Sequence, residues 1–321
     1  MMNQAILDFA KQFRFIPRIE NGPLRKYKKF IVAGMGGSAL AASILKTLKP
    51  ELDIVTHRDY GLPFVGERDL KKTLVIASSY SGNTEETLSA LEEAQKRGLA
   101  VVCIAVGGKL LEIAKGSKLP YIELPNTGIQ PRSALGFSLK AMLKAMKQSE
   151  LLKESRELVK ILKPKELEQA GKDLAERIRG HFPVIYASRK NCSVAYNWKI
   201  KFNETGKTPA FFNVFPELNH NEMTGFDVKD TSRELSAKTH FIFLKDPSDH
   251  LQIQKRMDIT AKLYKDRGLS VEILELKGEN EMHKVFSSLV TADWAAFYTA
   301  EGYGLESEQV PMVEEFKGLI K

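Results

Sequence analysis

The chain has 321 residues, of which 43% are hydrophobic and 27% are charged, a composition typical of soluble globular proteins with room for two domains. The formal net charge is +8. Because basic residues are interleaved with glutamates and no basic stripe carries stacking aromatics, we do not expect nucleic-acid binding. No stretch approaches the roughly 18 uninterrupted apolar residues of a membrane-spanning helix, so we expect no membrane segment.

The N-terminal sequence and the cysteines indicate the compartment. Residues 1–14 scatter Asp8, Lys11 and Arg14 among apolar residues, unlike the basic, apolar and small-residue regions of a secretory signal. The two cysteines, Cys103 and Cys192, lie in apolar or helix-like contexts rather than in a disulfide framework. We therefore expect a cytoplasmic protein.

The first half of the chain alternates strand and helix signals. Apolar runs predict five strands, at residues 29–33, 53–56, 73–77, 100–105 and 121–124. Helical patterns at 38–48 and 84–96 follow the first and third of these runs. Short apolar strands separated by helix-length segments are typical of a parallel sheet covered on both faces.

A largely helical segment at 133–163, which ends before Pro164, separates this half from a second series. The second series predicts strands at 183–187, 210–214, 240–244 and 271–274, and helices at 193–204, 251–266 and 282–303. We therefore predict an α/β protein with two doubly wound parallel sheets, in domains 1–152 and 153–321. In such folds the loops at the C-terminal ends of the strands bind ligands.

A glycine-rich loop follows the first predicted strand: Gly34-Met35-Gly36-Gly37-Ser38-Ala39. Its spacing fits a relaxed dinucleotide fingerprint, in which glycines let the backbone approach a pyrophosphate at a helix N-terminus. Asp59 could then bind a ribose. A tight turn that needs glycine for a positive φ fits equally well, so this loop alone leaves both interpretations open.

A hydroxyl-rich loop follows the third predicted strand: Ser78-Ser79-Tyr80-Ser81-Gly82-Asn83-Thr84-Glu85-Glu86. Three serines and a threonine surround a glycine at the start of a helix, where hydroxyl and backbone N–H groups can converge on one small anion. Asn83 or Thr84 could instead cap the helix, but capping explains one hydroxyl rather than four. The pattern therefore favours a phosphate monoester site.

These two loops together resemble the sugar isomerase (SIS) domain. Further motifs, in the same order along nearly the whole chain, are similar to those of the bifunctional phosphoglucose/phosphomannose isomerase family: Pro131-Arg132-Ser133-Ala134-Leu135-Gly136, Asn203-Glu204, Pro216-Glu217-Leu218-Asn219-His220-Asn221-Glu222, Asp293-Trp294-Ala295 and Phe316-Lys317. The resemblance implies an isomerase that interconverts glucose 6-phosphate, and mannose 6-phosphate, with fructose 6-phosphate in glycolysis and gluconeogenesis. Residues 306–313 lack the Asp-Pro-Thr-Pro expected there, which leaves the mannose activity open.

This reaction defines what the site residues must do. An aldose–ketose isomerase opens the sugar ring, removes a proton beside the carbonyl, stabilises an enediolate and returns the proton one carbon away. The resemblance implies that Glu204 is the base, that Arg132 stabilises the enediolate, and that His220 and Lys317 open the ring. It also implies a homodimer in which His220 reaches the active site of the other subunit.

The substrate phosphate is expected at the two loops, on Gly36, Gly37, Ser38, Ser79, Ser81 and Thr84. Neither a metal nor a cofactor is expected, because this route requires none and the six histidines and two cysteines lack metal-ligand spacing. Gly206-Lys207-Thr208 resembles the end of a nucleotide-binding loop, but Lys201 stands where that loop requires a glycine.

Three other functions remain open on the sequence. A SIS-domain sugar-phosphate sensor would keep the phosphate loops without needing Glu204, Arg132 and His220 together. An isomerase of an amino-sugar phosphate or a pentose phosphate would keep all of them. A nicotinamide-dependent oxidoreductase built on the first loop would leave the hydroxyl-rich loop unexplained.

Overall fold

The computed structural model describes residues 2–320, apart from the side chains of Glu67 and Arg68. The chain forms two compact units. The N-terminal unit is Asp8–Leu162, and the C-terminal unit runs from Lys163 onward and includes the helix α1 (Met2–Leu7). The division lies ten residues after 152–153, where the sequence placed it, because α7 (Ser149–Glu154) and α8 (Leu158–Ile161) pack on α6 (Leu135–Ala145) and η1 (Phe9–Arg14) of the N-terminal unit.

The N-terminal unit contains a five-stranded parallel sheet in the order β2-β1-β3-β4-β5. All five predicted strands are confirmed: β1 (Lys29–Ala33), β2 (Asp53–His57), β3 (Thr73–Ser78), β4 (Ala100–Ala105) and β5 (Tyr121–Glu123). In the register of the central strands, Ala33 is level with both His57 and Ala77. The glycine-rich and hydroxyl-rich loops therefore leave neighbouring strands at the same edge of the sheet.

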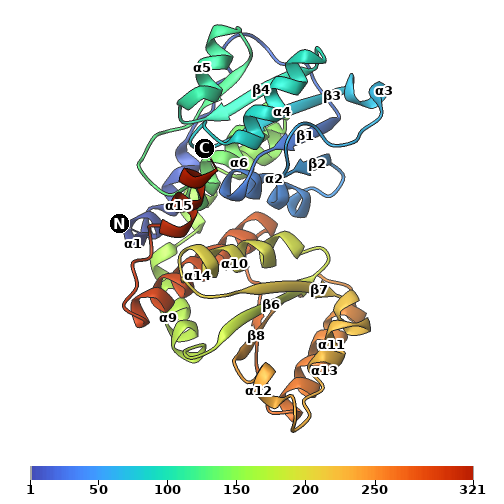
Figure 1. Cartoon of the computed structure of the whole chain (residues 1–321), viewed down its shortest axis with the longest axis vertical. Coiled ribbons are helices and arrows are strands. Elements are labelled where there is room, and N and C mark those ends of the chain that lie inside the picture. Colours follow the sequence, from blue (N-terminus) through green and yellow to red (C-terminus); the bar gives the residue numbers. More distant parts are fainter. Residues whose placement is uncertain (1, 321) are drawn as a thin grey trace. The chain divides into compact units, whose positions relative to one another are not determined.

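Helices cover both faces of this sheet (Figure 1). One face packs against α4 (Glu85–Lys96) and α5 (Gly108–Gly116), where Val75, Cys103 and Leu91 share a buried cluster. On the other side α2 (Gly36–Leu48) packs against α6 and the short helix η2 (Pro131–Ser133). A short α3 (Glu67–Leu70) precedes β3.

The C-terminal unit contains a four-stranded parallel sheet in the order β7-β6-β8-β9. The four strands predicted here are also confirmed: β6 (Phe182–Ser188), β7 (Phe211–Phe215), β8 (Thr239–Lys245) and β9 (Ser270–Glu275). The first four strands of each unit thus follow one order, in which the first strand along the chain lies between the second and the third. The predicted pair of doubly wound parallel sheets is confirmed.

Figure 1 shows α10 (Cys192–Glu204) and α14 (Glu281–Gly302) on one face of the second sheet and α13 (Leu251–Asp266) on the other. The α13 face buries an aromatic cluster that includes Tyr186, Phe241 and Tyr264. Shorter helices complete the unit: η3 (Pro164–Leu167), α9 (Glu168–Arg177), η4 (Glu217–His220), α11 (Glu222–Gly225), α12 (Arg233–Ser236) and α15 (Pro311–Leu319).

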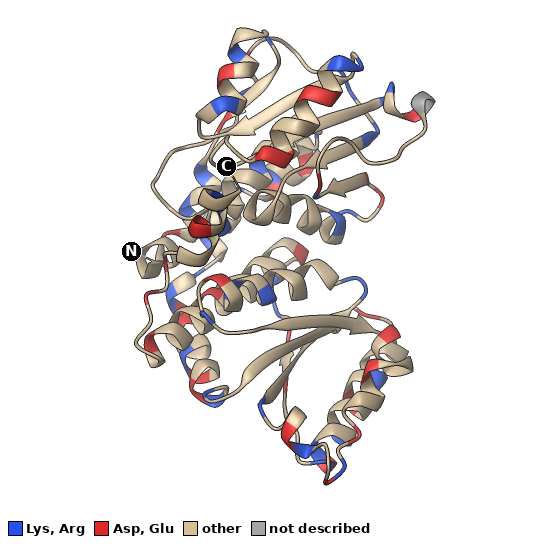
Figure 2. Ribbon diagram, in the orientation of Figure 1, with Lys and Arg blue, Asp and Glu red and all other residues tan. Residues whose placement is uncertain are grey.

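The structure agrees with the sequence in how charged residues are distributed and in the apolar character of its helices. Lys and Arg are interspersed with Asp and Glu along both units (Figure 2). Within residues 2–320, no helix combines the length and the apolar character needed to cross a membrane.

Candidate active site

The glycine-rich loop joins β1 to α2 and needs its glycines for close backbone approach. A side chain at Gly34 would place Cβ 2.6 Å from the Ser78 carbonyl oxygen, and one at Gly37 would place it 2.6 Å from the Pro131 carbonyl carbon. Gly36 has a φ of +46°. The helix begins after an extended Met35, whose thioether is at best a weak acceptor. The first N–H groups of a helix have no intrahelical partner, so those of Gly36 and Gly37 can donate to an anion.

The hydroxyl-rich loop is organised around Ser79, which is almost fully buried. Its Oγ accepts from the backbone N–H groups of Gly82 and Thr84, at 3.1 and 3.4 Å, and lies 2.7 Å from Thr84 Oγ1. Thr84 is the N-cap residue of α4, yet in the described structure its hydroxyl contacts Ser79 rather than capping the helix. Ser81 is exposed, and its Oγ accepts from the N–H of Asn83 at 3.3 Å. Simple capping therefore does not account for this loop.

Direct hydrogen bonds connect the two loops. The Ser38 hydroxyl oxygen accepts from the Tyr80 N–H at 2.8 Å, and the Ser78 hydroxyl donates to the Ser38 carbonyl at 3.3 Å. Both Ser38 and Ser79 are thus tied into the loop framework. The structure thus joins the two loops that carry the six predicted phosphate-binding residues, Gly36, Gly37, Ser38, Ser79, Ser81 and Thr84.

A third loop, between β4 and α5, supports the hydroxyl-rich loop, and the sequence did not reveal it. Gly82 has a φ of +77°, and a Cβ there would lie 1.8 Å from the Gly107 carbonyl oxygen. The Lys109 N–H donates to Asn83 Oδ1 at 3.1 Å. The paired glycines Gly107 and Gly108 were the available sequence signal, because adjacent glycines after a strand mark a close backbone approach.

Arg132 lies beside the glycine-rich loop, in η2, and only 2% of its surface is exposed. A Cβ at Gly37 would lie 2.8 Å from the Arg132 backbone nitrogen. Gln12 supports this segment: its Nε2 donates to the Ser133 carbonyl at 2.6 Å, and its Oε1 accepts from the Gly136 N–H at 2.9 Å. Arginine keeps its charge at any relevant pH, so this edge of the first sheet has a fixed positive group.

Glu204 is the last residue of α10 and is half-buried. One turn earlier, the Lys201 ammonium lies 2.5 Å from Asp293 Oδ1 on α14, and both side chains are buried. The Lys201 carbonyl accepts the N–H groups of Thr205 at 2.8 Å and Gly206 at 3.1 Å. A buried ion pair and the backbone that follows the helix thus fix the position of Glu204. This gives the Asp293-Trp294 motif a physical role.

His220 ends the short helix η4, directly after the edge strand β7, and its side chain is exposed. The loop around it is anchored. Asn219 Nδ2 donates to Thr260 Oγ1 at 2.9 Å, and the Glu222 carboxylate accepts from the Tyr186 hydroxyl and the Asn213 amide. A fixed loop therefore presents an accessible imidazole.

Lys317 lies on α15, none of whose described residues is buried. Its ammonium is 2.7 Å from Glu314 Oε1, and both side chains are largely exposed. Glu204, His220 and Lys317 thus come from three separate elements of the C-terminal unit, whereas Arg132 and the glycine-rich and hydroxyl-rich loops belong to the N-terminal unit.

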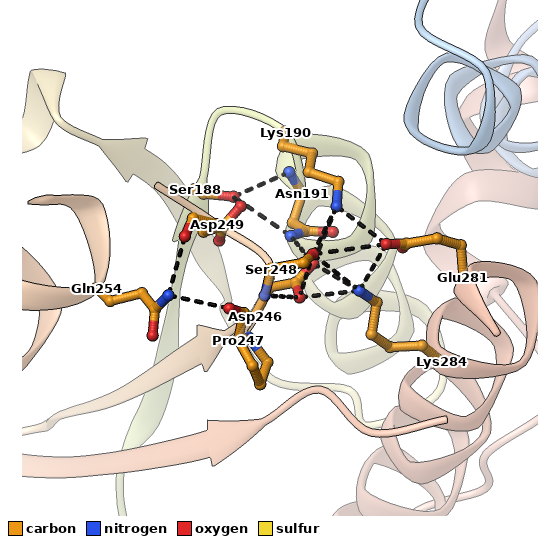
Figure 3. A network of polar contacts seen from close by, with 10 residues as sticks. All are labelled: Ser188, Lys190, Asn191, Asp246, Pro247, Ser248, Asp249, Gln254, Glu281 and Lys284. Carbon is orange, nitrogen blue, oxygen red and sulfur yellow. Dashed lines mark hydrogen bonds and ion pairs between the residues drawn. The ribbon is translucent and has the colours of Figure 1, made fainter. Parts of the chain in front are cut away.

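A network of ion pairs at the C-terminal edge of the second sheet was not predicted (Figure 3). Asp246, after β8, is fully buried, and its two carboxylate oxygens accept from the Lys284 ammonium at 2.8 and 2.9 Å. Lys190 and Asn191, after β6, also donate to Asp246, and Lys190 and Lys284 both pair with Glu281. The sequence concealed this network, because its members come from three segments that each look like ordinary polar surface.

The two buried aspartates of this network differ. Burial alone would raise the pKa of Asp246, but hydrogen bonds from Lys284, Ser248 and Asn191 outweigh it and hold that pKa well below its usual range. Burial raises the pKa of Asp249, although the Ser188 hydroxyl donates to it at 2.9 Å. Within the described residues, Asp249 Oδ2 is buried without a hydrogen-bond partner. The network thus holds one well-paired and one poorly paired carboxylate.

Comparisons with known proteins agree with this architecture. The family model for the bacterial phospho-glucose isomerase C-terminal SIS domain matches residues 167–320. A bifunctional phosphoglucose/phosphomannose isomerase of Aquifex aeolicus is 36% identical over 306 residues, which cover 93% of this chain and 92% of that protein. One from Thermoplasma volcanium is 36% identical over 323 residues, or 98% of each.

Solved structures show the same fold at lower identity. A glucosamine-6-phosphate deaminase of Thermotoga maritima aligns with a TM-score of 0.69 and 19% identity, covering 97% of both chains. The sequence identity to these relatives extends over nearly the full length, so it specifies the family of this chain, whereas the shared fold alone does not. The chain belongs to the bifunctional phosphoglucose/phosphomannose isomerase family of SIS-domain proteins.

Proposed function

We propose that this chain is an aldose–ketose isomerase that interconverts glucose 6-phosphate and mannose 6-phosphate with fructose 6-phosphate, in the cytoplasm and without a metal. The observation that carries the proposal is the joined pair of loops at the C-terminal edge of the first sheet, which gathers helix N-terminal N–H groups and hydroxyls of the kind that bind a small anion. The family relationship supports the phosphate of a hexose as that anion.

In this proposal the phosphate is bound by the N–H groups of Gly36 and Gly37 and by the exposed hydroxyl of Ser81. Ser38 and Ser79 hold the loops in shape, since their hydroxyls are engaged within the framework. The phosphate thereby fixes one end of the sugar. Such positioning makes the proton transfer effectively intramolecular.

The proton transfer itself is assigned to Glu204, which removes the proton from C2 of the aldose and delivers it to C1. The charge that develops on the enediolate oxygen is stabilised by the guanidinium of Arg132. The buried pair of Lys201 and Asp293 supports the role of Glu204, because a base must hold its position to within a fraction of an ångström.

Ring opening requires a proton donor and acceptor near the ring oxygen. We assign it to His220, whose two ring nitrogens can donate and accept a proton, and to Lys317. The exposed position of His220, at the end of the short helix that follows an edge strand, supports a homodimer in which each subunit supplies this histidine to the other.

The role of Glu204 can be tested by Glu204→Gln. The variant should bind fructose 6-phosphate normally but exchange the C2 proton of glucose 6-phosphate with solvent about 100 to 10,000 times more slowly. Glu176→Gln, which changes an exposed carboxylate on α9, serves as the control and should keep the wild-type rate. Wild-type exchange by Glu204→Gln would refute the assignment.

Subunit mixing tests the donated histidine. Glu204→Gln and His220→Ala should each be inactive alone. If His220 acts across the interface, mixed dimers contain one intact site of two, and random mixing restores about a quarter of wild-type activity. A mixture that exchanges subunits but stays inactive would place His220 in the active site of its own chain.

A further inference from the structure

Lys207, three residues after the end of α10, has a left-handed backbone conformation, with a φ of +56°. Helices commonly end with a residue in this region, usually glycine, because a Cβ there is crowded by the neighbouring carbonyl. A lysine in this conformation costs about 1–2 kcal/mol relative to an unstrained backbone. Gly206 directly precedes it but does not occupy the left-handed position. A compensating role of the Lys207 side chain would account for this cost.

The Lys207 ammonium joins two backbone segments. Nζ donates to the carbonyl of Glu204 at 2.7 Å and to the carbonyl of Gln309. The first acceptor lies at the C-terminal end of α10, where a cation is favoured by the partial negative charge of the helix. The second lies two residues before α15. One half-buried side chain thus connects the residue proposed as the base to the segment that carries Lys317.

The segment before α15 is ordered up to this contact. The Glu306 carboxylate accepts from the N–H groups of Glu308 at 2.7 Å and Gln309 at 2.5 Å, and Ser307 is buried. Beyond it, α15 has no buried residue among those the structure describes. The position of α15 within this unit therefore depends on the segment that precedes it.

We propose that Lys207 is a positioning residue that holds the C-terminal segment, and with it Lys317, in a fixed relation to Glu204. The inference rests on the proposed function for its catalytic consequence, but the link itself is a property of the fold. Ring opening and proton transfer act on adjacent atoms of one sugar, so their protein groups must be held in a common geometry.

Two other lysines provide matched comparisons. Lys118 and Lys147 follow α5 and α6, and each has a φ of +54°. Both side chains are exposed. Replacing either by glycine changes the backbone as Lys207→Gly does, but removes no bridge between segments. Lys118→Gly is therefore the control for the backbone effect.

The test compares Lys207→Gly, Lys207→Arg and Lys118→Gly. Tryptophan fluorescence reports unfolding of the C-terminal unit, because both tryptophans, Trp198 and Trp294, lie in it. Lys207→Gly should unfold at the same or a higher denaturant concentration, since glycine relieves the backbone. Its residues 303–320 should exchange amide hydrogens faster, and its kcat should fall at least about tenfold with little change in KM. Lys207→Arg should recover most of the activity and protection.

The outcomes separate this inference from the proposed function. Hydrogen exchange needs no substrate, so unchanged protection of residues 303–320 in Lys207→Gly would overturn the link whatever the activity. A wild-type protein without isomerase activity would remove the proposed function, while faster exchange in Lys207→Gly would still support the link. A loss of kcat that Lys118→Gly shares would refute the positioning role, since it would be a backbone effect.

Discussion

The two units have the same order of their first four strands, yet they use opposite ends of the corresponding helix. In the N-terminal unit, α2 follows the first strand, β1, and its N-terminus carries the glycines of the glycine-rich loop. In the C-terminal unit, α10 follows the first strand, β6, and its C-terminal residue is Glu204. One topology thus supplies a proposed phosphate-binding group from one end of a helix and a proposed base from the other.

The difference follows from what lies at each sheet edge. The first edge has glycines, hydroxyls and free helix N–H groups, which suit an anion. The second edge carries the carboxylates of Asp246, Asp249 and Glu281 (Figure 3). Its lysines, Lys190 and Lys284, are already paired with Asp246 and Glu281. An anion there would meet like charges. We therefore expect one phosphate site per chain, because strand order alone does not make a binding site.

Removing the central carboxylate of the ion-pair network at the edge of the second sheet should have the largest effect on stability. Asp246→Ala leaves the buried ammonium of Lys284 without its main partner, so the free energy of unfolding of the C-terminal unit should fall by about 3–5 kcal/mol. Denaturant titration followed by tryptophan fluorescence measures it. Asp258→Ala removes an exposed carboxylate that pairs with Lys245 and should change stability far less. Equal effects would show that the network does not stabilise this edge.

Disturbing the first edge should affect substrate binding more than folding. Gly37→Ala adds a Cβ within 2.6 to 2.8 Å of the backbone of Pro131 and Arg132, so the loops must shift. We expect KM for fructose 6-phosphate to rise about tenfold or more, which corresponds to about 1.4 kcal/mol of binding free energy. Gly302→Ala, where a Cβ meets nothing within 4 Å, should leave KM unchanged. An unchanged KM in Gly37→Ala would separate this loop from the phosphate.

The smallest predicted effect is on the pH dependence of stability, in which Asp249 and Asp246 should differ. Folding raises the pKa of Asp249. Its contribution to the free energy of unfolding is therefore fully present below the pKa of the unfolded state, and is lost as the pH rises through the pKa of the folded state. Asp249→Asn should therefore gain stability relative to the wild type between acidic and neutral pH, by on the order of 1 kcal/mol.

The pKa of Asp246 is lowered, so its contribution has the opposite sign. The stabilisation by Asp246 is present above the pKa of the unfolded state and is lost as the pH falls through the pKa of the folded state. Unfolding midpoints measured from acidic to neutral pH should show the two opposite trends. A destabilised Asp249→Asn at neutral pH would contradict the assignment of a poorly paired carboxylate.

The sequence predicted the parts of this fold that depend on local pattern. All nine strands were found, because buried parallel strands form short apolar runs. The segment predicted as largely helical at 133–163 contains three helices, α6, α7 and α8, among its described residues. Helix α9 was missed because its sequence, Glu-Gln-Ala-Gly-Lys-Asp, is polar and contains a glycine. The glycine and hydroxyl loops were recognisable because each is contiguous.

Long-range polar contacts could not be predicted from one sequence. The support of Arg132 by Gln12 spans more than a hundred residues. Lys201 and Asp293 each look like ordinary positions on an amphipathic helix, and nothing local shows that both are buried and paired. The sequence around Lys207 indicates only an incomplete nucleotide motif, whereas the structure shows its left-handed backbone conformation and its two carbonyl partners.

The most direct test of the account is an assay of purified protein in EDTA with fructose 6-phosphate as substrate and separate detection of the two aldose products. The account predicts that both glucose 6-phosphate and mannose 6-phosphate form. If neither forms while fructose 6-phosphate still binds, the chain is a sugar-phosphate sensor and the catalytic assignment of Glu204 is wrong.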